Sequence, residues 1–338
     1  MSEQFGFNLI RLAFLSLTTS YHLGKTWLEN QQAPPGQLID IDGYKIHLYT
    51  QGTGSPTVIL DHSLGGLDGY FLIDKIAKIT RVCIYDRPGY GWSEPSSKPR
   101  CTESIVRELN ELLERAEIEP PYILVGNSFG SYNVRLYAHY YPEKVIGMIL
   151  TDGLSETFML KLPMALKAIK LFFLSGFLMS ILGSILGLVR LLGHLKVFEF
   201  IKPDLRQFSP EVLERVKKSF YRPKHWLTMA RELWNLEKSA SQVKVANSFR
   251  EIPLISIKAK TFFKRSPWNF YLPLNQVEEF REKMHTDLLR LSEDVSQLPA
   301  SGSSHFVWID EPQVILAAIE QLISNLSKQQ SDKIRQKE

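Results

Sequence analysis

Short apolar runs alternate with stretches of helical spacing along most of the chain. Two runs of alternating polar and apolar residues within 38–52 flank Asp42-Gly43, a dipeptide typical of a β-hairpin turn. Further apolar runs of strand length follow at 56–60, 81–86, 122–126, 145–152, 252–259 and 296–301. Helical spacing recurs between these runs, and a closing helix is predicted at 312–328. This alternation predicts a parallel sheet with helices on both faces.

The stretch between the strands at 145–152 and 252–259 has about a hundred residues and no convincing strand, which indicates an inserted helical segment. Its residues 171–189 are uncharged and bounded by Lys170 and Arg190, so their length alone makes them a transmembrane candidate. A single span would place the two strands on opposite sides of a membrane, although both belong to one sheet. We therefore expect a very apolar lid, such as a helical hairpin, that contacts a membrane or a hydrophobic substrate. A purely structural lid core is the alternative.

The N-terminal stretch 5–19 is also apolar. It has no basic segment before it and no small-residue cleavage site, so no cleavable signal peptide is expected. Its uninterrupted apolar part is too short to span a bilayer. Gln4, Asn8, Arg11 and Thr18 recur at helical spacing and leave a polar stripe on an otherwise apolar helix. Such a helix packs against its own domain or lies in a membrane interface, so the chain is expected to be cytoplasmic or membrane-associated.

These patterns divide the chain into five segments. We expect an apolar N-terminal helix and linker at 1–37, an α/β core made of 38–155 and 250–328, a helical cap at 156–249, and a charged, frayed tail at 329–338.

Composition and residue spacing argue against a nucleic-acid partner, a disulfide framework and a metal site. The 40 basic and 36 acidic residues are interspersed and give a net charge of +4, so no nucleic-acid partner is expected. The two cysteines, Cys83 and Cys101, do not make a disulfide framework. The eight histidines show no ligand spacing, so no metal site is expected. The chemistry predicted below requires no organic cofactor either.

Residues 123–138, ILVGNSFGSYNVRLYA, place Ser128 where an apolar run gives way to helical spacing. Gly126 and Gly130 flank the serine in the Gly-x-Ser-x-Gly pattern of a nucleophile elbow, a tight turn that leaves the hydroxyl exposed. The alternative is a Gly/Ser turn that merely joins a strand to a helix.

A serine hydroxyl is a poor nucleophile without a base to take its proton. In an open parallel sheet that base is expected at the carboxyl end of a strand. His305 follows the final predicted strand and precedes the closing helix, in a flexible loop that contains Ser301 to Ser304. The other histidines lie inside predicted strands or helices, in the inserted segment or, for His62, in an earlier loop. His305 is therefore the predicted base.

A carboxylate is needed to hold the imidazole in one tautomer and to stabilise its charged form. The loop after the strand at 252–259, KAKTFFKRSPWNF, contains no acidic residue. Asp152 lies directly at the end of the preceding strand, and we predict that it is the acid. The alternative role for Asp152 is to cap the first helix of the lid. Glu156 is the alternative acid.

Acyl transfer also needs hydrogen-bond donors for the oxyanion. We predict the backbone N–H of Phe129, directly after the nucleophile, and that of Leu64 in the loop after the strand at 56–60. Gly65 and Gly66 allow a close approach of that loop, and His62 is expected to make a structural hydrogen bond there.

Over about residues 38–326 the chain resembles the α/β-hydrolase superfamily. The segments that carry the resemblance are DHSLGG at 61–66, YDRPGYGWSEP at 85–95, GNSFG at 126–130 and SSHF at 303–306. The resemblance implies an eight-stranded, mostly parallel sheet, a helical cap inserted after the sixth strand, and a Ser128–His305–Asp152 triad. It also implies that Asp86 and Arg87 belong to a structural turn rather than to the site.

The chain departs from the usual family pattern at three places. Ser63 follows His62 where a glycine is usual, Asn127 stands where histidine is commoner, and Ser304 replaces the glycine before His305. An aspartate at the elbow would indicate dehalogenases or epoxide hydrolases, and Ser128 argues against both.

The sequence thus predicts a serine hydrolase of the carboxylesterase or lipase type. It would cleave esters of hydrophobic acyl groups through an acyl-enzyme intermediate. The expected partners are a small hydrophobic ester and, through the N-terminal helix or the cap, the surface of a membrane. One alternative is a non-catalytic binder of hydrophobic ligands on a hydrolase scaffold, motivated by the three departures. Another is a peptidase or amidase, for which the lid lacks the acidic residues that would hold a substrate amine.

Overall fold

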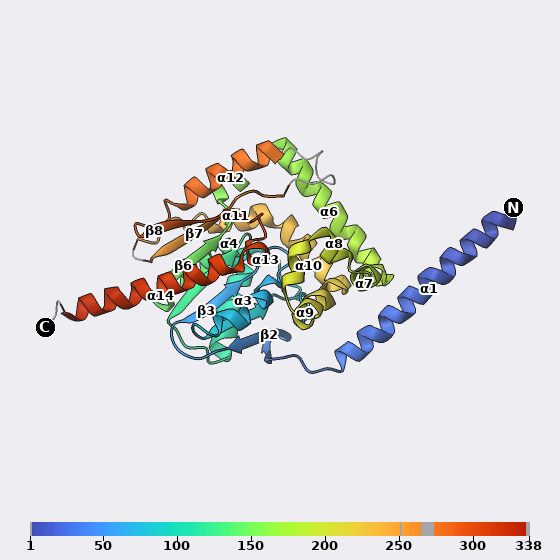
Figure 1. Ribbon diagram of the computed structural model, residues 1–338, viewed down its shortest axis with the longest axis horizontal. Coiled ribbons are helices and arrows are strands. Elements are labelled where there is room, and N and C mark those ends of the chain that lie inside the picture. Colours follow the sequence, from blue (N-terminus) through green and yellow to red (C-terminus); the bar gives the residue numbers. More distant parts are fainter. Residues whose placement is uncertain (1, 251, 265–273, 336–338) are drawn as a thin grey trace.

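Eight strands form one sheet in the order β1-β2-β4-β3-β5-β6-β7-β8 (Figure 1). The computed structural model describes residues 2–250, 252–264 and 274–335, so part of the loop after β7 and the final residues of the predicted tail lie outside it. The strands are β1 (Gln37–Ile41), β2 (Tyr44–Gln51), β3 (Thr57–Asp61), β4 (Val82–Asp86), β5 (Tyr122–Asn127), β6 (Val145–Thr151), β7 (Leu254–Ala259) and β8 (Val295–Ala300). β1 pairs with β2, and β2 with β4, in antiparallel fashion, and every other pair is parallel. The predicted mostly parallel α/β sheet is confirmed.

The hairpin between β1 and β2 turns at the predicted dipeptide. Asp42 has φ 53° and Gly43 has φ 86°, and two consecutive positive φ angles are the geometry of a type I′ turn. This turn sets the register in which Ile41 lies opposite Tyr44. The local sequence alone was therefore sufficient to place this element.

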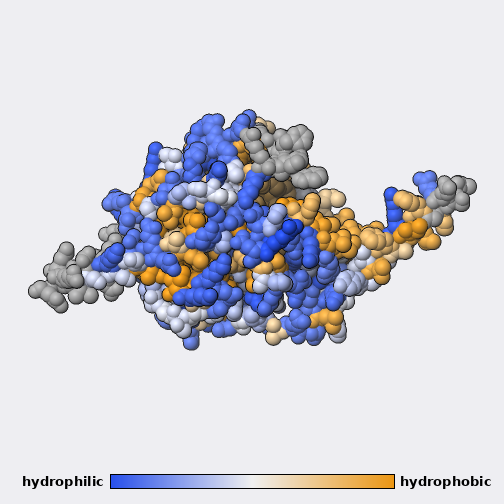
Figure 2. Space-filling model, viewed as in Figure 1, coloured by the Kyte–Doolittle hydropathy of each residue, from blue (hydrophilic) through white to orange (hydrophobic). Residues whose placement is uncertain are grey.

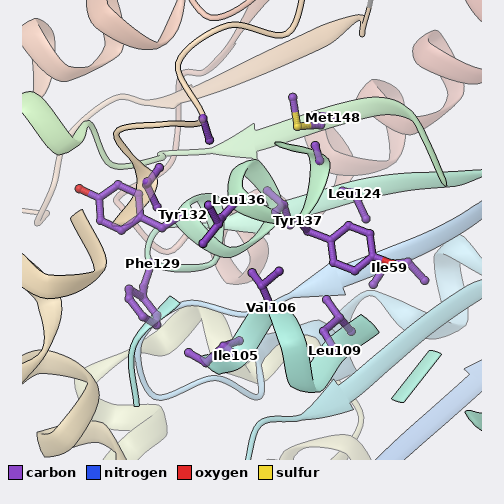
Figure 3. Packing of buried hydrophobic residues seen from close by; sticks show 14 of the residues in the cluster. Ile59, Ile105, Val106, Leu109, Leu124, Phe129, Tyr132, Leu136, Tyr137 and Met148 are labelled. Atoms are coloured by element: carbon purple, nitrogen blue, oxygen red, sulfur yellow. The ribbon is translucent and has the colours of Figure 1, made fainter. Parts of the chain in front are cut away.

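Alternate side chains of the strands supply two separate cores. Ile59 and Leu124 belong to a core on one face with α3 (Thr102–Arg115), α4 (Gly130–Tyr140) and α12 (Leu274–Leu288). Figure 3 shows Val106 and Leu109 of α3 beside side chains of α4 and the sheet. Leu60 belongs to the core on the other face with α2 (Ile73–Ile76), α13 (Val307–Asp310) and α14 (Pro312–Arg335). The period of two along β3 thus explains why helices cover both faces.

The chain between β6 and β7 is helical, as predicted. It forms α5 (Glu156–Met159), α6 (Met164–Ile185), α7 (Leu188–His194), α8 (Val197–Ile201), the 3₁₀ helix η3 (Pro203–Gln207), α9 (Pro210–Phe220), α10 (Pro223–Trp234) and α11 (Leu236–Val243). We call these elements the inserted helices. α6 is a single helix that packs along α10, so the expected hairpin within 171–189 is wrong. The reason is that the first break in the helix comes only at Gly187, which has φ 73°.

Both ends of the chain are long helices. α1 (Ser2–Asn30) extends away from the sheet, and its C-terminal half contacts the inserted helices (Figure 1). α14 continues to Arg335, beyond the end predicted at Lys328. Two 3₁₀ helices, η1 (Asp68–Phe71) and η2 (Pro142–Lys144), complete the regular structure of the described residues.

A buried ion pair network joins the sheet to the inserted helices. Arg87, which is fully buried, donates to Asp61 Oδ1 at 2.9 Å and to Glu232 Oε1 of α10 at 2.8 Å. It also donates to the carbonyl oxygens of His62 and Ser63, at 2.9 and 2.7 Å. Arg87 therefore has the structural role expected from the sequence and holds the loop after β3 in place.

We expect the substitution Arg87→Met to lower the free energy of unfolding by about 3–5 kcal/mol, because it leaves Asp61 and Glu232 buried without their cation. Urea denaturation at neutral pH measures this change. The matched control is Arg107→Met, because Arg107 is 70% exposed in its pair with Glu103. This substitution should lower the free energy of unfolding by less than about 0.5 kcal/mol. Equal effects of the two substitutions would show that the buried network adds no stability.

Candidate active site

Ser128 lies on the sharp turn between β5 and α4. Its φ is +51°, which is rare for a residue other than glycine and is typical of a nucleophile elbow. A Cβ at Gly126 would lie 2.7 Å from the carbonyl oxygen of Gly130, and a Cβ at Gly130 would lie 2.3 Å from that of Asp61. Both positions of the Gly-x-Ser-x-Gly pattern therefore need glycine for the turn to close.

The structure brings Ser128, His305 and Asp152 together from three separate loops. His305 Nε2 lies 2.9 Å from Ser128 Oγ, and His305 Nδ1 lies 2.5 Å from Asp152 Oδ2. A carboxylate can only accept, so Nδ1 carries the proton and Nε2 is free to accept the serine hydroxyl proton. This is the arrangement that a serine nucleophile, a base and an orienting acid require.

Asp152 follows β6 and is 3% exposed. Its φ of 42° is tolerated by aspartate, and its backbone N–H donates to the carbonyl of Ile257 at 2.8 Å, which continues the pairing of β6 with β7. Its side chain does not cap α5, whose N-cap residue is Ser155. The pairing of β6 with β7 thus holds this carboxylate at the end of β6.

Two further residues of α12 bind the same carboxylate. Arg281 Nη2 donates to Asp152 Oδ1 at 2.6 Å, and His285 Nε2 lies 2.8 Å from that oxygen. Burial raises the pKa of Asp152, but the hydrogen bonds from His285 and His305 and the charge of Arg281 outweigh burial and lower it well below its usual value. Neither residue of α12 was predicted from the sequence. Their spacing of four residues puts them on one helix face, but nothing in the sequence places that face beside Asp152.

The pair between Arg281 and Asp152 predicts a specific pH dependence. A carboxyl group whose folded pKa is lowered stabilises the folded chain above its unfolded pKa of about 4, and this contribution is lost as the pH falls through the lowered value. We expect Arg281→Gln to lower the free energy of unfolding by about 1.5–3 kcal/mol at neutral pH. The difference in the free energy of unfolding between Arg281→Gln and the wild type should become smaller below about pH 4.

Urea denaturation at neutral pH and at about pH 3 tests this expectation. Arg281 also binds Glu278, so Glu278→Gln is the control that removes the second carboxylate and keeps Asp152. If Arg281→Gln were destabilised by the same amount at both pH values, the pairing with Asp152 would be contradicted.

Glu156, the alternative acid, lies elsewhere. Its Oε2 accepts from Arg135 at 2.7 Å, and it lines a polar surface cleft of about 340 Å³ together with Lys244 and Asp287. None of Ser128, His305 and Asp152 lines that cleft. The geometry therefore supports Asp152 rather than Glu156 as the partner of His305.

The loop after β3 approaches the elbow, as the oxyanion assignment requires. The N–H groups of Phe129 and Leu64 have no acceptor among the described residues, so both are available to a ligand oxygen. Arg87 fixes the carbonyl groups of His62 and Ser63, directly before Leu64. The roles of Phe129 and Leu64 stay predictions.

Two of the three departures from the family pattern, Ser63 and Asn127, are connected through Asp68. Asn127 Nδ2 donates to Asp68 Oδ2 at 2.5 Å, and Ser63 Oγ donates to the same oxygen at 3.3 Å. His62 Nδ1 lies 3.1 Å from Asp68 Oδ1, to which it donates when it carries the proton, and 3.0 Å from the backbone nitrogen of Gly69. Burial raises the pKa of Asp68, but the contact with His62 and the hydrogen bond from Asn127 lower it below its usual value. A charged Asp68 thus links the loop after β3 to the elbow.

Ser304, the third departure, holds the loop of His305. Its N–H and its hydroxyl donate to Asp310 Oδ2 at 2.8 and 2.7 Å. Lys202 of the inserted segment pairs with the same carboxylate. A glycine at position 304 could not make the second bond, so the serine adds order to the loop that carries the base.

Aromatic side chains cover the candidate base. The ring of Phe262 stacks on His305 with centroids 4.5 Å apart, and Phe263 contacts Phe262 at 4.6 Å. Phe263 also meets Phe173 of α6 at 6.4 Å. One side of the site is therefore apolar. The described residues contain no group of three or more His, Cys, Asp or Glu side chains that could hold a metal ion.

Comparison with known proteins agrees with the fold. A protein-family model described as the alpha/beta hydrolase fold matches residues 56–183, which contain β3 to β6 and the elbow. Over these residues the chain is similar to the α/β hydrolases, and its eight-stranded sheet has the α/β-hydrolase fold. The uncharacterized protein YbdG of Bacillus subtilis (strain 168) is 28% identical over 128 residues, which cover 36% of this chain and 39% of YbdG. The uncharacterized protein YqjL of the same strain is 23% identical over 286 residues, which cover 82% of this chain and 88% of YqjL.

Solved structures share the fold of this chain. The epoxide hydrolase CorEH is 16% identical with a TM-score of 0.60, and the match covers 86% of this chain and 98% of CorEH. The enol-lactonase of Burkholderia xenovorans LB400 is 14% identical with a TM-score of 0.56, covering 85% of this chain and all of the enol-lactonase chain. At this identity the likeness extends to the fold alone.

Proposed function

We propose that this α/β-hydrolase is a serine esterase that cleaves carboxylic esters with hydrophobic acyl groups. The observation that carries the proposal is the hydrogen-bonded series Ser128–His305–Asp152, in which His305 contacts the other two at 2.9 and 2.5 Å. It stands on an elbow whose next N–H, that of Phe129, has no protein acceptor among the described residues.

The chemistry follows from these positions. Ser128 Oγ attacks the carbonyl carbon of the ester while His305 Nε2 takes the hydroxyl proton, and the N–H groups of Phe129 and Leu64 bind the oxyanion. The bond to the alcohol oxygen then breaks, and His305 returns the proton to the leaving alcohol. A water molecule, deprotonated by His305, attacks the acyl-enzyme and releases the acid and Ser128. Asp152 stabilises the imidazolium form in both halves.

The surroundings of the site favour an apolar acyl group. Phe262 and Phe263 lie beside His305, and the adjoining aromatic side chain of the inserted helices is Phe173. Such a wall stabilises a hydrophobic substrate group by removing it from water. An aspartate nucleophile like that expected of epoxide hydrolases is not available at the elbow, because Ser128 occupies it.

Two measurements on the full chain test the proposal. A fluorophosphonate probe should label the wild type and not Ser128→Ala, and p-nitrophenyl esters of short and long acids should both be hydrolysed, the longer with the lower KM. Labelling without turnover of any ester would indicate a serine hydrolase that acts on another bond, such as an amide. A chain that neither reacts with the probe nor hydrolyses either ester would instead be a binder of hydrophobic ligands.

A further inference from the structure

Helix α6 turns an apolar face to solvent. By length and composition it is the one described helix able to cross a membrane, yet only 11% of its most apolar stretch, within Leu166–Ile185, is buried. Its outward-facing large side chains are each 48% exposed or more: Met164, Leu171, Phe172, Leu178, Met179, Leu182 and Ile185. They recur at intervals that place them on one side of the helix.

The first half of α1 is exposed in the same way. Its large apolar side chains are each at least 48% exposed: Phe5, Phe7, Leu9, Ile10, Leu12, Phe14 and Leu17. They point in most directions around the helix, apart from a narrow polar stripe that includes Asn8 and Arg11. Figure 2 shows apolar surface where α6 and α7 meet α1 and along α1 itself. We call these two sets of side chains the apolar surface.

Buried polar contacts fix the two helices relative to each other. Thr18 Oγ1 donates to the carbonyl of Leu186 at 2.9 Å, and Arg190 of α7 donates to both carboxylate oxygens of Glu29, at 2.6 and 2.9 Å. A Cβ at Gly187 would lie 2.4 Å from the carbonyl oxygen of Thr18, so the corner between α6 and α7 fits directly against α1. The exposed apolar side chains of α1 and α6 are therefore held in a fixed arrangement relative to each other.

Within the two stretches of chain that carry this surface, the charged residues are all basic. No acidic residue stands between Glu3 and Glu29, or between Glu156 and Glu199, in a chain with 36 acidic residues. The basic residues within these two stretches are Arg11, Lys25, Lys161, Lys167, Lys170, Arg190 and Lys196. Two of these cations are paired with carboxylates, Arg190 with Glu29 and Lys170 with Glu237. The excess of basic residues beside exposed apolar groups complements an anionic bilayer.

We propose that the apolar surface docks this protein on an anionic phospholipid membrane, with α6 in the plane of the interface and the first half of α1 among the acyl chains. α6 does not span, because its inner face packs on α10, and β6 and β7 on either side of the inserted helices pair in one sheet. A second protein would cover one side of α1, whereas lipid can surround a helix that is apolar in most directions.

Docking would also define the source of the substrate, an extension that rests on the proposed ester hydrolysis. Phe177 and Phe173 on α6 have ring centroids 6.4 Å apart, and Phe173 leads through Phe263 and Phe262 to His305. α6 is about 10 Å thick, so the lipid surface would lie roughly one helix diameter from this aromatic path. The substrate class is then an amphiphilic ester dissolved in the membrane.

Flotation of the full chain with vesicles tests the docking. We expect the wild type to float with phosphatidylcholine vesicles containing about 30% phosphatidylglycerol and less with phosphatidylcholine alone. The variant Phe172→Gln/Met179→Gln/Leu182→Gln should reduce the bound fraction at least about tenfold, because three apolar side chains no longer enter the lipid. Phe7→Gln/Ile10→Gln/Phe14→Gln should act in the same direction, and glutamine keeps both helices favourable.

The matched control is Leu38→Gln/Tyr140→Gln/Val245→Gln, three side chains that are also exposed but lie outside the apolar surface. This control should float like the wild type, and circular dichroism should show that all variants are folded. A wild type that floats with neither vesicle, or an α6 variant that floats as well as the wild type, would overturn the proposal. So would a dimer in lipid-free solution that the α6 substitutions dissociate without any binding to vesicles, because the occupant would then be a second copy.

The docking and the esterase proposal can fail separately. Ser128→Ala should float like the wild type, since the serine lies outside the apolar surface. A fluorogenic long-chain ester presented in vesicles should be hydrolysed more slowly by the α6 variant, while soluble p-nitrophenyl acetate is hydrolysed at the wild-type rate. Flotation without hydrolysis of either ester would leave docking intact and reject the esterase. If the α6 variant hydrolysed both esters more slowly by the same factor, the membrane would be rejected as the source of the substrate.

Discussion

Ser128→Ala is expected to lower kcat for p-nitrophenyl ester hydrolysis by about a millionfold, to the level left by binding and the oxyanion donors. The reason is that Ser128 Oγ is the hydroxyl that contacts His305 Nε2, whereas the hydroxyl of Ser131, one turn along α4, donates to the carbonyl of Ser128 at 2.6 Å. KM should change little, because the substitution removes the attacking atom and not the pocket. Steady-state kinetics with a short ester provides the measurement.

The control for this experiment is Ser131→Ala. It deletes a neighbouring hydroxyl that donates to the Ser128 carbonyl and accepts from the N–H of Leu154, and it should change kcat by less than about tenfold. The free energy of unfolding of Ser128→Ala should stay within about 1 kcal/mol of the wild type. If Ser128→Ala kept most of the activity, another nucleophile would have to act, and the elbow would be a structural turn.

Asp152→Asn should lower kcat by about 10⁴-fold at neutral pH, because the amide no longer selects the tautomer with the proton on Nδ1 or stabilises the imidazolium. Asparagine is tolerated at the positive φ of 42°, so the backbone at this position should keep its conformation. The substitution also leaves Arg281 without one of its two carboxylate partners, so a lower stability is expected together with the lower kcat. Measuring kcat against pH at a temperature well below unfolding separates the two effects.

Glu156→Gln is the matched control for the acid. It removes the pair with Arg135 at 2.7 Å and leaves the contacts of His305 intact, so stability should fall while kcat stays within about threefold. The opposite pattern, with activity lost in Glu156→Gln and kept in Asp152→Asn, would make the assignment of Asp152 wrong. Similar large losses of kcat in both would indicate that the pair between Glu156 and Arg135 is needed to position Asp152.

Much of this architecture could be predicted because it depends on residues that are close in the sequence. The alternation in β1 and β2, the Asp42-Gly43 turn and the apolar run before Ser128 each predict a local conformation, and all three are confirmed. The order of strands and helices then places the carboxyl ends of β5, β6 and β8 at one edge of the sheet. That rule, the Gly-x-Ser-x-Gly pattern and the lack of an acidic residue in the loop after β7 together predicted Ser128, Asp152 and His305 as neighbours, and the structure places them in contact.

The remaining features depend on packing between distant elements. Arg281 and His285 reach Asp152 across more than a hundred residues, and Asp68 connects Ser63 to Asn127 on another strand. The continuous α6 and its contact with α1 through Arg190 and Glu29 likewise depend on which faces meet. By itself the sequence determined the strands, the turns and the chemical types at the site, because backbone propensity and hydrophobic periodicity act over a few residues. Only the tertiary structure decided the partners of the buried charges and the side of α6 left to solvent, because these depend on how distant elements pack and which charges are desolvated together.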